Sequence, residues 1–149
     1  MSGMTIISAD ATDIIYQGGI AFYWDDTRAK WLSLCVEAFE FAYDGSLSGG
    51  WMKFSPEALT SSATAGYLRG YAMVCVGGAA QAGASSTCAF RLGDDGSIAA
   101  SIALSSATVV SDDTLNTSTI AADSILACYV TGTATTSSHA TFYCRRVLA

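Results

Sequence analysis

Charged side chains are scarce in this sequence. Asp, Glu, Lys and Arg make up 13% of its 149 residues, against the usual ~25% for soluble domains. Hydrophobic residues account for 51%, and Ser, Thr and Gly are abundant. The surface must therefore be built largely from small uncharged side chains. This composition favours association with other subunits, because the buried parts of protein interfaces are depleted of charge.

Basic residues are the scarcest of the charged ones, with seven Lys and Arg against 13 Asp and Glu, and the formal net charge is −6. Binding to nucleic acid needs cations that neutralise phosphates, and adhesion to anionic lipid needs them too. The one basic pair, Arg145-Arg146, is expected to be a solvent contact at a strand end or an interface salt bridge. We therefore expect neither nucleic acid nor a membrane as a direct partner.

Long apolar runs are absent as well. No stretch approaches the roughly 18 apolar residues of a membrane span, and residues 1–19 lack the basic and apolar regions of a secretory leader. The five cysteines are odd in number and without C-x-x-C spacing, so they indicate buried reduced thiols that act as small hydrophobes. They are Cys35, Cys75, Cys88, Cys128 and Cys144. Reduced thiols favour assembly in a cytoplasm.

Catalytic groups are few. A Ser-His-Asp hydrolase would depend on His139, the only histidine, whose Ser/Thr-rich surroundings are typical of a strand edge. The acidic pairs Asp25-Asp26, Asp94-Asp95 and Asp112-Asp113 each fall where a turn is expected, so they do not indicate the carboxylates of a glycosidase cleft. Neither an EF-hand loop nor a phosphate-binding loop is present. The sequence predicts no enzyme, no cofactor and no metal.

What is present is a series of short apolar segments separated by turn residues at intervals of roughly eight to twelve residues. Residues 36–43 also allow a helix, but their aromatic side chains fall at every second position, which favours a strand. A helical turn is plausible at residues 55–59, around the single proline. Strands are expected at 36–43, 51–54, 66–76, 87–92, 98–104, 109–110, 115–120, 125–131 and 139–148, with loops at 77–86, 93–96 and 132–138.

This pattern predicts an all-β protein, an antiparallel β-sandwich with a jelly-roll-like topology. The expected core consists of large apolar residues on the inward faces of these strands. They are Phe39, Phe41, Tyr71, Met73, Val74, Phe90, Ile102, Leu126, Tyr129 and Phe142.

The most distinctive stretch is an aromatic hairpin. Strand-forming residues at Phe22–Trp24 and at 31–34 flank a short polar turn that begins with Asp25-Asp26. In such a hairpin Trp24 and Trp31 would face each other across the two strands, a pairing that contributes up to ~1 kcal/mol. The simplest interpretation of this hairpin is a structural one.

The stretch FYWDDTRAKWLS resembles an aromatic Asp-Thr-Arg-x-Lys-Trp-Leu-Ser segment near the start of small structural modules in tailed-bacteriophage virions. In those modules the segment precedes a β-sandwich of jelly-roll type, and residues 66–149 are similar to such a sandwich. The modules occur in capsid decoration proteins and in tail or fibre proteins alike. The resemblance implies a non-enzymatic virion protein that is assembled in the host cytoplasm.

From these features we expect an N-terminal arm at residues 1–19, with a possible short strand at Thr5–Ile7, and one β-sandwich domain at 20–149. Residues 20–65 form the hairpin and an aromatic lead-in, and residues 66–149 form the regular strands. The candidate interaction surface consists of exposed-type aromatic and charged residues of the lead-in. They are Trp24, Asp25, Arg28, Lys30, Trp31 and Trp51.

Two functions are open. The first is a capsid decoration, or cement, protein that bridges major-capsid subunits and stabilises the head. The alternative is a tail or fibre module that binds a host surface glycan by stacking a tryptophan on a sugar, or that joins tail components. In both cases uncharged strands favour a homo-oligomer, a trimer or a dimer, because sheet edges without Lys or Glu lack protection against association.

Overall fold

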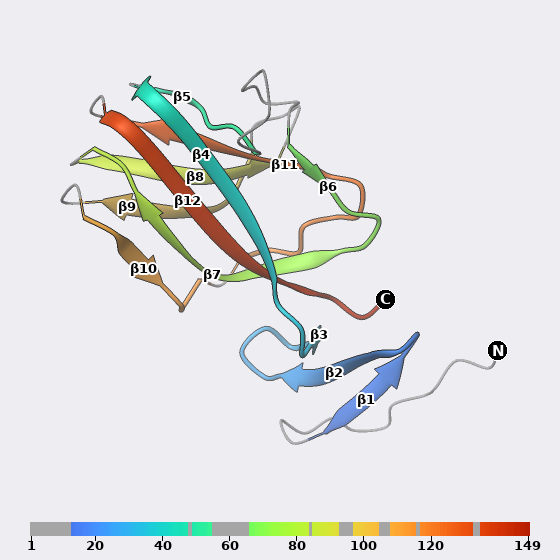
Figure 1. The fold of residues 1–149 in the computed structure, drawn as a ribbon. Helices are drawn as coiled ribbons and strands as arrows, with labels where there is room; N and C mark the ends of the chain where they lie inside the picture. The colour runs from blue at the N-terminus through green and yellow to red at the C-terminus, as the bar shows by residue number, and fades with distance from the viewer. Residues whose placement is uncertain are drawn as a thin grey trace.

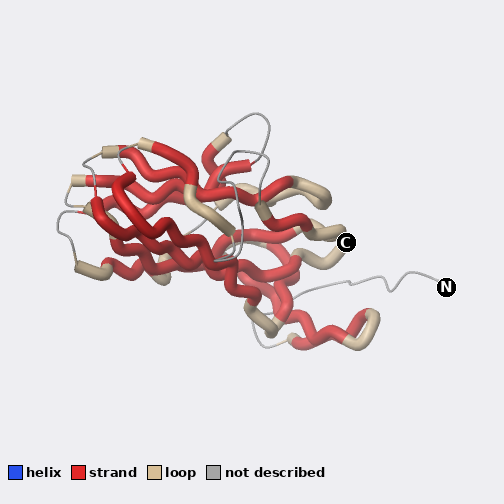
Figure 2. Tube along the Cα trace, turned by 45° about the horizontal axis from the view of Figure 1, so that its top comes forward, coloured by secondary structure: helices blue, strands red, loops and turns tan. Residues whose placement is uncertain are grey.

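The computed structural model describes residues 13–47, 49–54, 66–83, 85–92, 97–104, 108–115, 117–132 and 135–149. Within these ranges the chain forms strands and loops without a helix (Figure 2). All pairs of neighbouring strands are antiparallel. The predicted all-β class with antiparallel sheets is confirmed.

The strands form three sheets. The hairpin sheet has the order β1-β2-β3, with β1 at Ile14–Gln17, β2 at Ile20–Asp25 and β3 at Lys30–Ser33. The four-stranded sheet has the order β10-β7-β12-β4, with β4 at Glu37–Leu47, β7 at Met73–Gln81, β10 at Val110–Asp112 and β12 at Thr135–Arg146. The five-stranded sheet has the order β5-β11-β8-β9, and β6 also pairs with β11; β5 is Gly50–Trp51, β6 is Tyr67–Leu68, β8 is Ser86–Leu92, β9 is Ile98–Leu104 and β11 is Ile125–Thr131.

The pairing from β4 to β12 is nested. The first strand β4 pairs with the last strand β12, β5 and β6 pair with β11, β7 pairs with β10, and β8 pairs with β9. Two further pairings, β12 with β7 and β11 with β8, join these ribbons into the two larger sheets. The chain therefore runs as a doubled antiparallel ribbon that alternates between the two sheets.

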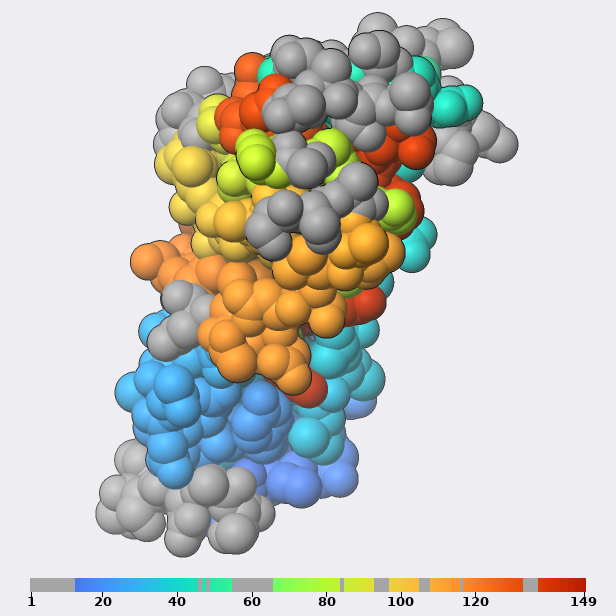
Figure 3. All heavy atoms as spheres, turned by 90° about the vertical axis from the view of Figure 1, so that its left-hand side faces the viewer, coloured from blue at the N-terminus to red at the C-terminus, as the bar shows by residue number. Residues whose placement is uncertain are grey.

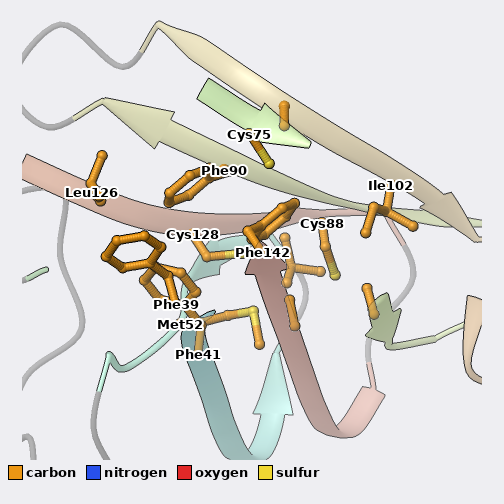
Figure 4. Close-up of a cluster of buried hydrophobic side chains, with 14 of the residues drawn as sticks. Phe39, Phe41, Met52, Cys75, Cys88, Phe90, Ile102, Leu126, Cys128 and Phe142 are labelled. Atoms are coloured by element: carbon orange, nitrogen blue, oxygen red, sulfur yellow. The ribbon is translucent and has the colours of Figure 1, made fainter. Parts of the chain in front are cut away.

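The core lies between the two larger sheets. In Figure 1 β4 and β12 cross in front of β8, β9 and β11, and Figure 4 shows aromatic and sulfur side chains from both layers meeting between them. Eight of the ten expected core residues are buried, whereas Tyr71 and Tyr129 are only half-buried. The period of two in β4 accounts for its part of this core, because Phe39 and Phe41 point inward while Glu40 is exposed.

The strand expected at 66–76 is instead two strands in different sheets. β6 pairs with β11, whereas β7 begins at Met73 and lies between β10 and β12. The loop expected at 77–86 is also wrong, because β7 continues to Gln81. Small residues serve close packing there: a Cβ on Gly78 would lie 2.8 Å from the backbone oxygen of Thr141 and 3.0 Å from Cδ1 of Ile102. Glycine in this strand marks a close approach and not a turn.

No strand forms among the described residues of the range 115–120, contrary to the prediction. There the Thr117 hydroxyl accepts a hydrogen bond from the Cys75 backbone nitrogen at 3.0 Å, and only Ile120 makes a bridge, to Met73. Side-chain hydrogen bonding replaces the ladder, as threonine readily allows. The last strand begins earlier than expected, at Thr135, and β5 covers only Gly50–Trp51 of the region around 51–54.

The predicted hairpin is confirmed, and it has a third strand. β1 lies within the range expected for the arm, and Gly18-Gly19 joins it to β2 with both φ angles positive, at 58° and 77°. A two-residue turn of this kind matches the twist of antiparallel strands. The strand expected at Thr5–Ile7, the helical turn expected at 55–59 and the loop at 93–96 lie outside the described residues.

Candidate interaction surface

The hairpin sheet sits at one end of the body, beside the C-terminus, and β5 lies towards the opposite end (Figure 1). Trp24 and Trp31 are directly opposite in the β2–β3 register, and their rings meet edge to face with centroids 5.7 Å apart. Trp31 is buried and Trp24 is half-buried. The predicted cross-strand pair is confirmed, and its partners mainly stabilise the hairpin.

The turn between β2 and β3 is fixed by a single carboxylate. Asp25 accepts a hydrogen bond from the Arg28 backbone nitrogen at 2.8 Å and forms an ion pair with the Arg28 guanidinium, also at 2.8 Å. The guanidinium reaches further and donates to the Leu115 carbonyl, far away in sequence. Lys30 approaches the Arg28 carbonyl at 3.4 Å. Arg28 therefore connects the hairpin tip to the body, where blue and orange residues meet in Figure 3.

A second connection comes from the end of β12. Arg145 donates from Nη1 to the carbonyls of Ser33 and Leu34, at 2.7 and 2.6 Å, and its guanidinium lies 5.3 Å from the ring centre of Tyr23. The backbone nitrogen of Arg146 donates to the Ser33 hydroxyl at 2.9 Å. Arg145 therefore links two parts of the same chain. The expectation that it is a solvent contact or an interface salt bridge is wrong. These contacts hold the hairpin in one orientation.

Several large apolar side chains remain exposed at this end. Ile14 and Tyr16 on β1 are 51% and 74% exposed, and Leu34 and Val36 after β3 are 46% and 45% exposed. The four residues of β1 carry no charge, and β1 is the outer strand of its sheet. An uncharged edge strand with exposed apolar side chains is a surface suited to contact with another protein.

A groove of about 380 Å³ separates the hairpin from the four-stranded sheet. Its walls combine arginine, tyrosine and valine side chains, a set that occurs often in protein interfaces. They are Tyr23, Arg28, Val36, Val76, Gly77, Asp113, Tyr143 and Arg145. The Nε atom of Arg28 is buried without a hydrogen-bond partner.

The sixth residue of the expected surface lies elsewhere. Trp51 belongs to β5 of the five-stranded sheet and meets the Tyr129 ring edge to face at 5.0 Å. The guanidinium of Arg91 lies 4.6 Å from the ring centre of Tyr129 and 5.9 Å from that of Trp51. The structure thus brings together five of the predicted residues in the hairpin and separates Trp51 from them.

His139 lies on the exposed face of β12, between β4 and β7, and not at a sheet edge as expected. Together with Glu40, Lys53 and Thr141 it lines a hollow of about 520 Å³. At the edge of this hollow the Tyr67 hydroxyl donates to the carbonyls of Glu40 and Phe54, and burial raises the pKa of Tyr67. The convergence of Glu40 and His139 depends on the β4–β12 register, which the sequence does not reveal.

The acidic pairs that the structure describes lie where strands pass into turns: Asp25 and Asp112 end β2 and β10, and Asp26 and Asp113 follow in the turns. Besides Asp25, Asp112 accepts hydrogen bonds from the Thr114 backbone nitrogen at 2.8 Å and from its hydroxyl at 2.7 Å, and both bonds lower the pKa of Asp112. Asp94-Asp95 lies outside the described residues. Among the residues that are described, no group of three or more His, Cys, Asp or Glu is placed to hold a metal ion.

Four of the five thiols are buried, as predicted, but the prediction is wrong for Cys35, which is exposed after the end of β3. Burial raises the pKa of Cys88 to about 11 and raises that of Cys128 well above its usual value, so both stay protonated at neutral pH. Cys75 and Cys144 lie side by side on β7 and β12; the hydrogen bond between their thiols lowers the pKa of Cys75 and raises that of Cys144. These thiols act mainly as compact core residues.

Comparison of the chain with models of protein families, with curated proteins and with solved structures gave no match. Within the described ranges no helix is long and apolar enough to span a membrane. The inference about function therefore rests on the residues and the geometry of this chain.

Proposed function

We propose that this chain is a non-enzymatic structural protein of a tailed-phage virion, assembled in the host cytoplasm and attached to the particle by its hairpin end. The observation that carries the proposal is the rigidly linked hairpin with an uncharged apolar edge. Ile14 and Tyr16 are the most exposed large side chains of that edge, and Arg145 and Arg28 fix its orientation. A preorganised apolar surface binds with little loss of conformational entropy.

The fold class within this proposal is a jelly-roll β-sandwich. The nested pairing of β4 with β12, β5 and β6 with β11, β7 with β10 and β8 with β9 supports it. A doubled ribbon wrapped into two packed sheets produces this order, and viral capsid domains are among the proteins that use it. Residues 1–13 are a second candidate for attachment within this proposal.

As a decoration protein the chain would act by adhesion. The hairpin end would bury apolar area at junctions between major-capsid subunits, at ~25 cal/mol per Å². Many copies would add these modest contributions and oppose the pressure of the packaged DNA. The fixed angle of the hairpin would keep the body standing away from the shell.

The attachment test compares two matched substitutions. Ile14→Asp places a charge on β1, and Val109→Asp places one just before β10 of the body, where the residue is 58% exposed against 51% for Ile14. We expect Ile14→Asp to weaken binding to virions that lack the protein by about tenfold or more, whereas Val109→Asp should bind normally. Deletion of residues 1–13 should also weaken binding.

Two results would contradict this proposal. Equal binding of Ile14→Asp and wild-type protein would remove the hairpin as the attachment site. Quantitative mass spectrometry that found only a few copies per purified virion would remove the decoration role and favour a tail location.

A tail or fibre module that binds a host glycan is the second candidate, and one observation favours it. Trp51 and Tyr129 form a half-buried aromatic pair beside Arg91, away from the attachment end. Binding of the isolated protein to host-surface oligosaccharides on a glycan array, lost on Trp51→Ala, would support this function. Trp24 is a weaker candidate for sugar stacking, because it packs on Trp31 within the hairpin.

A further inference from the structure

Charge is unevenly divided between the two larger sheets. The five strands of the five-stranded sheet contain one charged residue, Arg91. The four-stranded sheet carries six in its strands, namely Glu37, Glu40, Asp44, Asp112, Arg145 and Arg146. A solvated outer face of an antiparallel sheet normally alternates polar, often charged, residues with the inward apolar ones.

The register identifies the outer face of the five-stranded sheet. Arg91 is opposite Ala127 and Ala89 is opposite Tyr129, whereas Phe90 and Cys128, the pair between them, belong to the core. Trp51 pairs with Tyr129, and Ser101 and Ala103 of β9 continue the same face. Ala89 is buried, whereas Ser101 and Ala103 are exposed and the three larger side chains are half-buried. We call Trp51, Arg91, Ser101, Ala103 and Tyr129 the outer five-strand face.

The composition of this face matches the buried centre of a protein interface. Trp, Tyr and Arg are the residue types that dominate binding energy at interfaces, and Lys, Asp and Glu are depleted there. The Arg91 guanidinium is already stacked on Tyr129 and Trp51, and its Nε atom is buried without a partner. Ser101 and Ala103 are small and exposed, and the register places the exposed apolar residues Ile98 and Leu68 on the same side of the sheet.

The shape of the face also favours a protein partner. Small-molecule and sugar sites are usually concave. Trp51, Arg91 and Tyr129 line none of the hollows at the hairpin groove, beside His139 and at the 117–120 segment next to β9. A sheet face of alanine, serine and stacked aromatics suits broad contact with another sheet.

We infer that the outer five-strand face is the interface between copies of this chain. Each copy has a net charge of −6, so self-association is least opposed where carboxylates do not meet. Among the described residues this face has a cation and aromatic rings but no acid, so contact between two such faces brings no carboxylates together. The acids of β4 and β10 remain on the outside of the assembly.

The arrangement of copies follows from the proposed function. A rotation axis that runs along the body places every hairpin at the same end, where all of them can contact one virion surface. An axis across the body would place the hairpins at opposite ends. The structure with the proposed attachment therefore implies a closed cyclic assembly, since closure avoids filaments.

The main test uses a matched pair of glutamate substitutions in exposed alanines on the edge strands of the two sheets. Ala103→Glu lies on β9 in the outer five-strand face, and Ala38→Glu lies on β4 in the other sheet. Sedimentation velocity should show that the wild-type protein is an oligomer. Self-association should be weaker by about tenfold or more in Ala103→Glu and unchanged in Ala38→Glu. Circular dichroism of both variants verifies that the strands are intact.

A wild-type protein that sediments as a monomer at micromolar concentration would overturn the inference. The inference would also be overturned if the oligomer dissociated in Ala38→Glu and remained intact in Ala103→Glu. If the monomer instead bound acidic or neutral oligosaccharides on an array, and Trp51→Ala abolished binding, the face would be a sugar site. None of these results depends on virion binding, so failure here is distinguishable from failure of the attachment.

A separate experiment tests whether the hairpins of all copies lie at the same end of the oligomer. It uses Cys35, which lies beside the hairpin and is the only exposed cysteine of the five. A spin label on Cys35 should give a short distance between copies by pulsed electron paramagnetic resonance. A long distance, in an oligomer that Ala103→Glu dissociates, would overturn the common direction of the hairpins.

Discussion

The rings of Phe90 and Phe142 stack almost parallel, with centroids 4.7 Å apart and planes at 8°, although one residue belongs to β8 and the other to β12. This contact joins the two larger sheets at the centre of the core, as Figure 4 shows. Phe41 of β4 approaches both rings, at 5.9 and 6.4 Å. The stability of the two-layer arrangement should therefore depend on this aromatic group.

The first prediction concerns this stack. Phe142→Ala should lower the free energy of unfolding by roughly 3–5 kcal/mol, because it removes a fully buried ring and leaves a cavity. The neighbouring Tyr143 points to the opposite face and is 39% exposed, so Tyr143→Ala serves as the control with a much smaller effect. Chemical denaturation measures both. Unchanged stability of Phe142→Ala, with a large loss in Tyr143→Ala, would show that the faces of β12 are reversed.

The second prediction concerns Gly78. A Cβ there would lie 2.8 Å from the Thr141 backbone oxygen, so Gly78→Ala should cost about 1–3 kcal/mol by overpacking. At Gly70 a Cβ would meet its nearest atom, Oδ1 of Asp123, at 3.8 Å, an ordinary contact. Thermal unfolding should therefore show a lower melting temperature for Gly78→Ala and little change for Gly70→Ala. An unchanged Gly78→Ala would disprove the close approach of β7 and β12.

The third prediction concerns the contacts that fix the hairpin to the body. Arg145→Ala removes two donated hydrogen bonds to Ser33 and Leu34, and hydrogen bonds of charged donors contribute about 1.5–3 kcal/mol each. We expect faster hydrogen exchange in β2 and β3 with little change in β8 and β11. Arg146→Ala is the control, because Arg146 contacts the hairpin through its backbone nitrogen and stacks its side chain over Tyr71. Unchanged exchange in Arg145→Ala would mean that other contacts fix the hairpin.

The fourth prediction concerns alkaline pH. Burial raises the pKa of Cys88 to about 11 in the folded protein, whereas the unfolded thiol ionises near ~8.5. Below the pKa of the unfolded thiol, Cys88 is protonated in both the folded and the unfolded protein. Its contribution to the free energy of unfolding is then fully present. Between these values the unfolded state releases its proton first, so the free energy of unfolding falls as pH rises, by about 3 kcal/mol near pH 11.

Melting curves at increasing pH test this directly. Cys88→Ala should be less stable than the wild type at neutral pH, and its melting temperature should fall less per pH unit. Part of the fall should remain because burial also raises the pKa of Cys128. Cys35→Ala, at an exposed thiol, should keep the wild-type slope. An identical slope in Cys88→Ala and wild type would contradict the prediction.

Local sequence features were sufficient for much of the fold. The alternation of Phe39 and Phe41 with polar or small neighbours indicated β4, and the turn chemistry around Asp25 indicated the hairpin with Trp24 opposite Trp31. The Gly18-Gly19 pair was a signal of the same kind that could have revealed β1. Turns and strand faces are properties of a few consecutive residues, so they are readable without the rest of the chain.

Glycine and alanine in β7 were misleading for the opposite reason. Gly77 and Gly78 have the composition of a loop, and only contact with β12, more than sixty residues later, shows that the chain is extended there. The split of residues 66–76 between two sheets likewise depends on which distant strands pair with each half.

The sequence by itself determined that the protein is all-β, that its strands are poor in charge, and that an aromatic hairpin precedes them. These properties follow from composition and from the period of two along a strand. Only the tertiary structure decided that Arg145 holds the hairpin, that Trp51 lies apart from Trp24 beside Arg91, and that the charges gather on one sheet. These features depend on register between residues far apart in the chain, which is set by packing of the whole core and not by local preference.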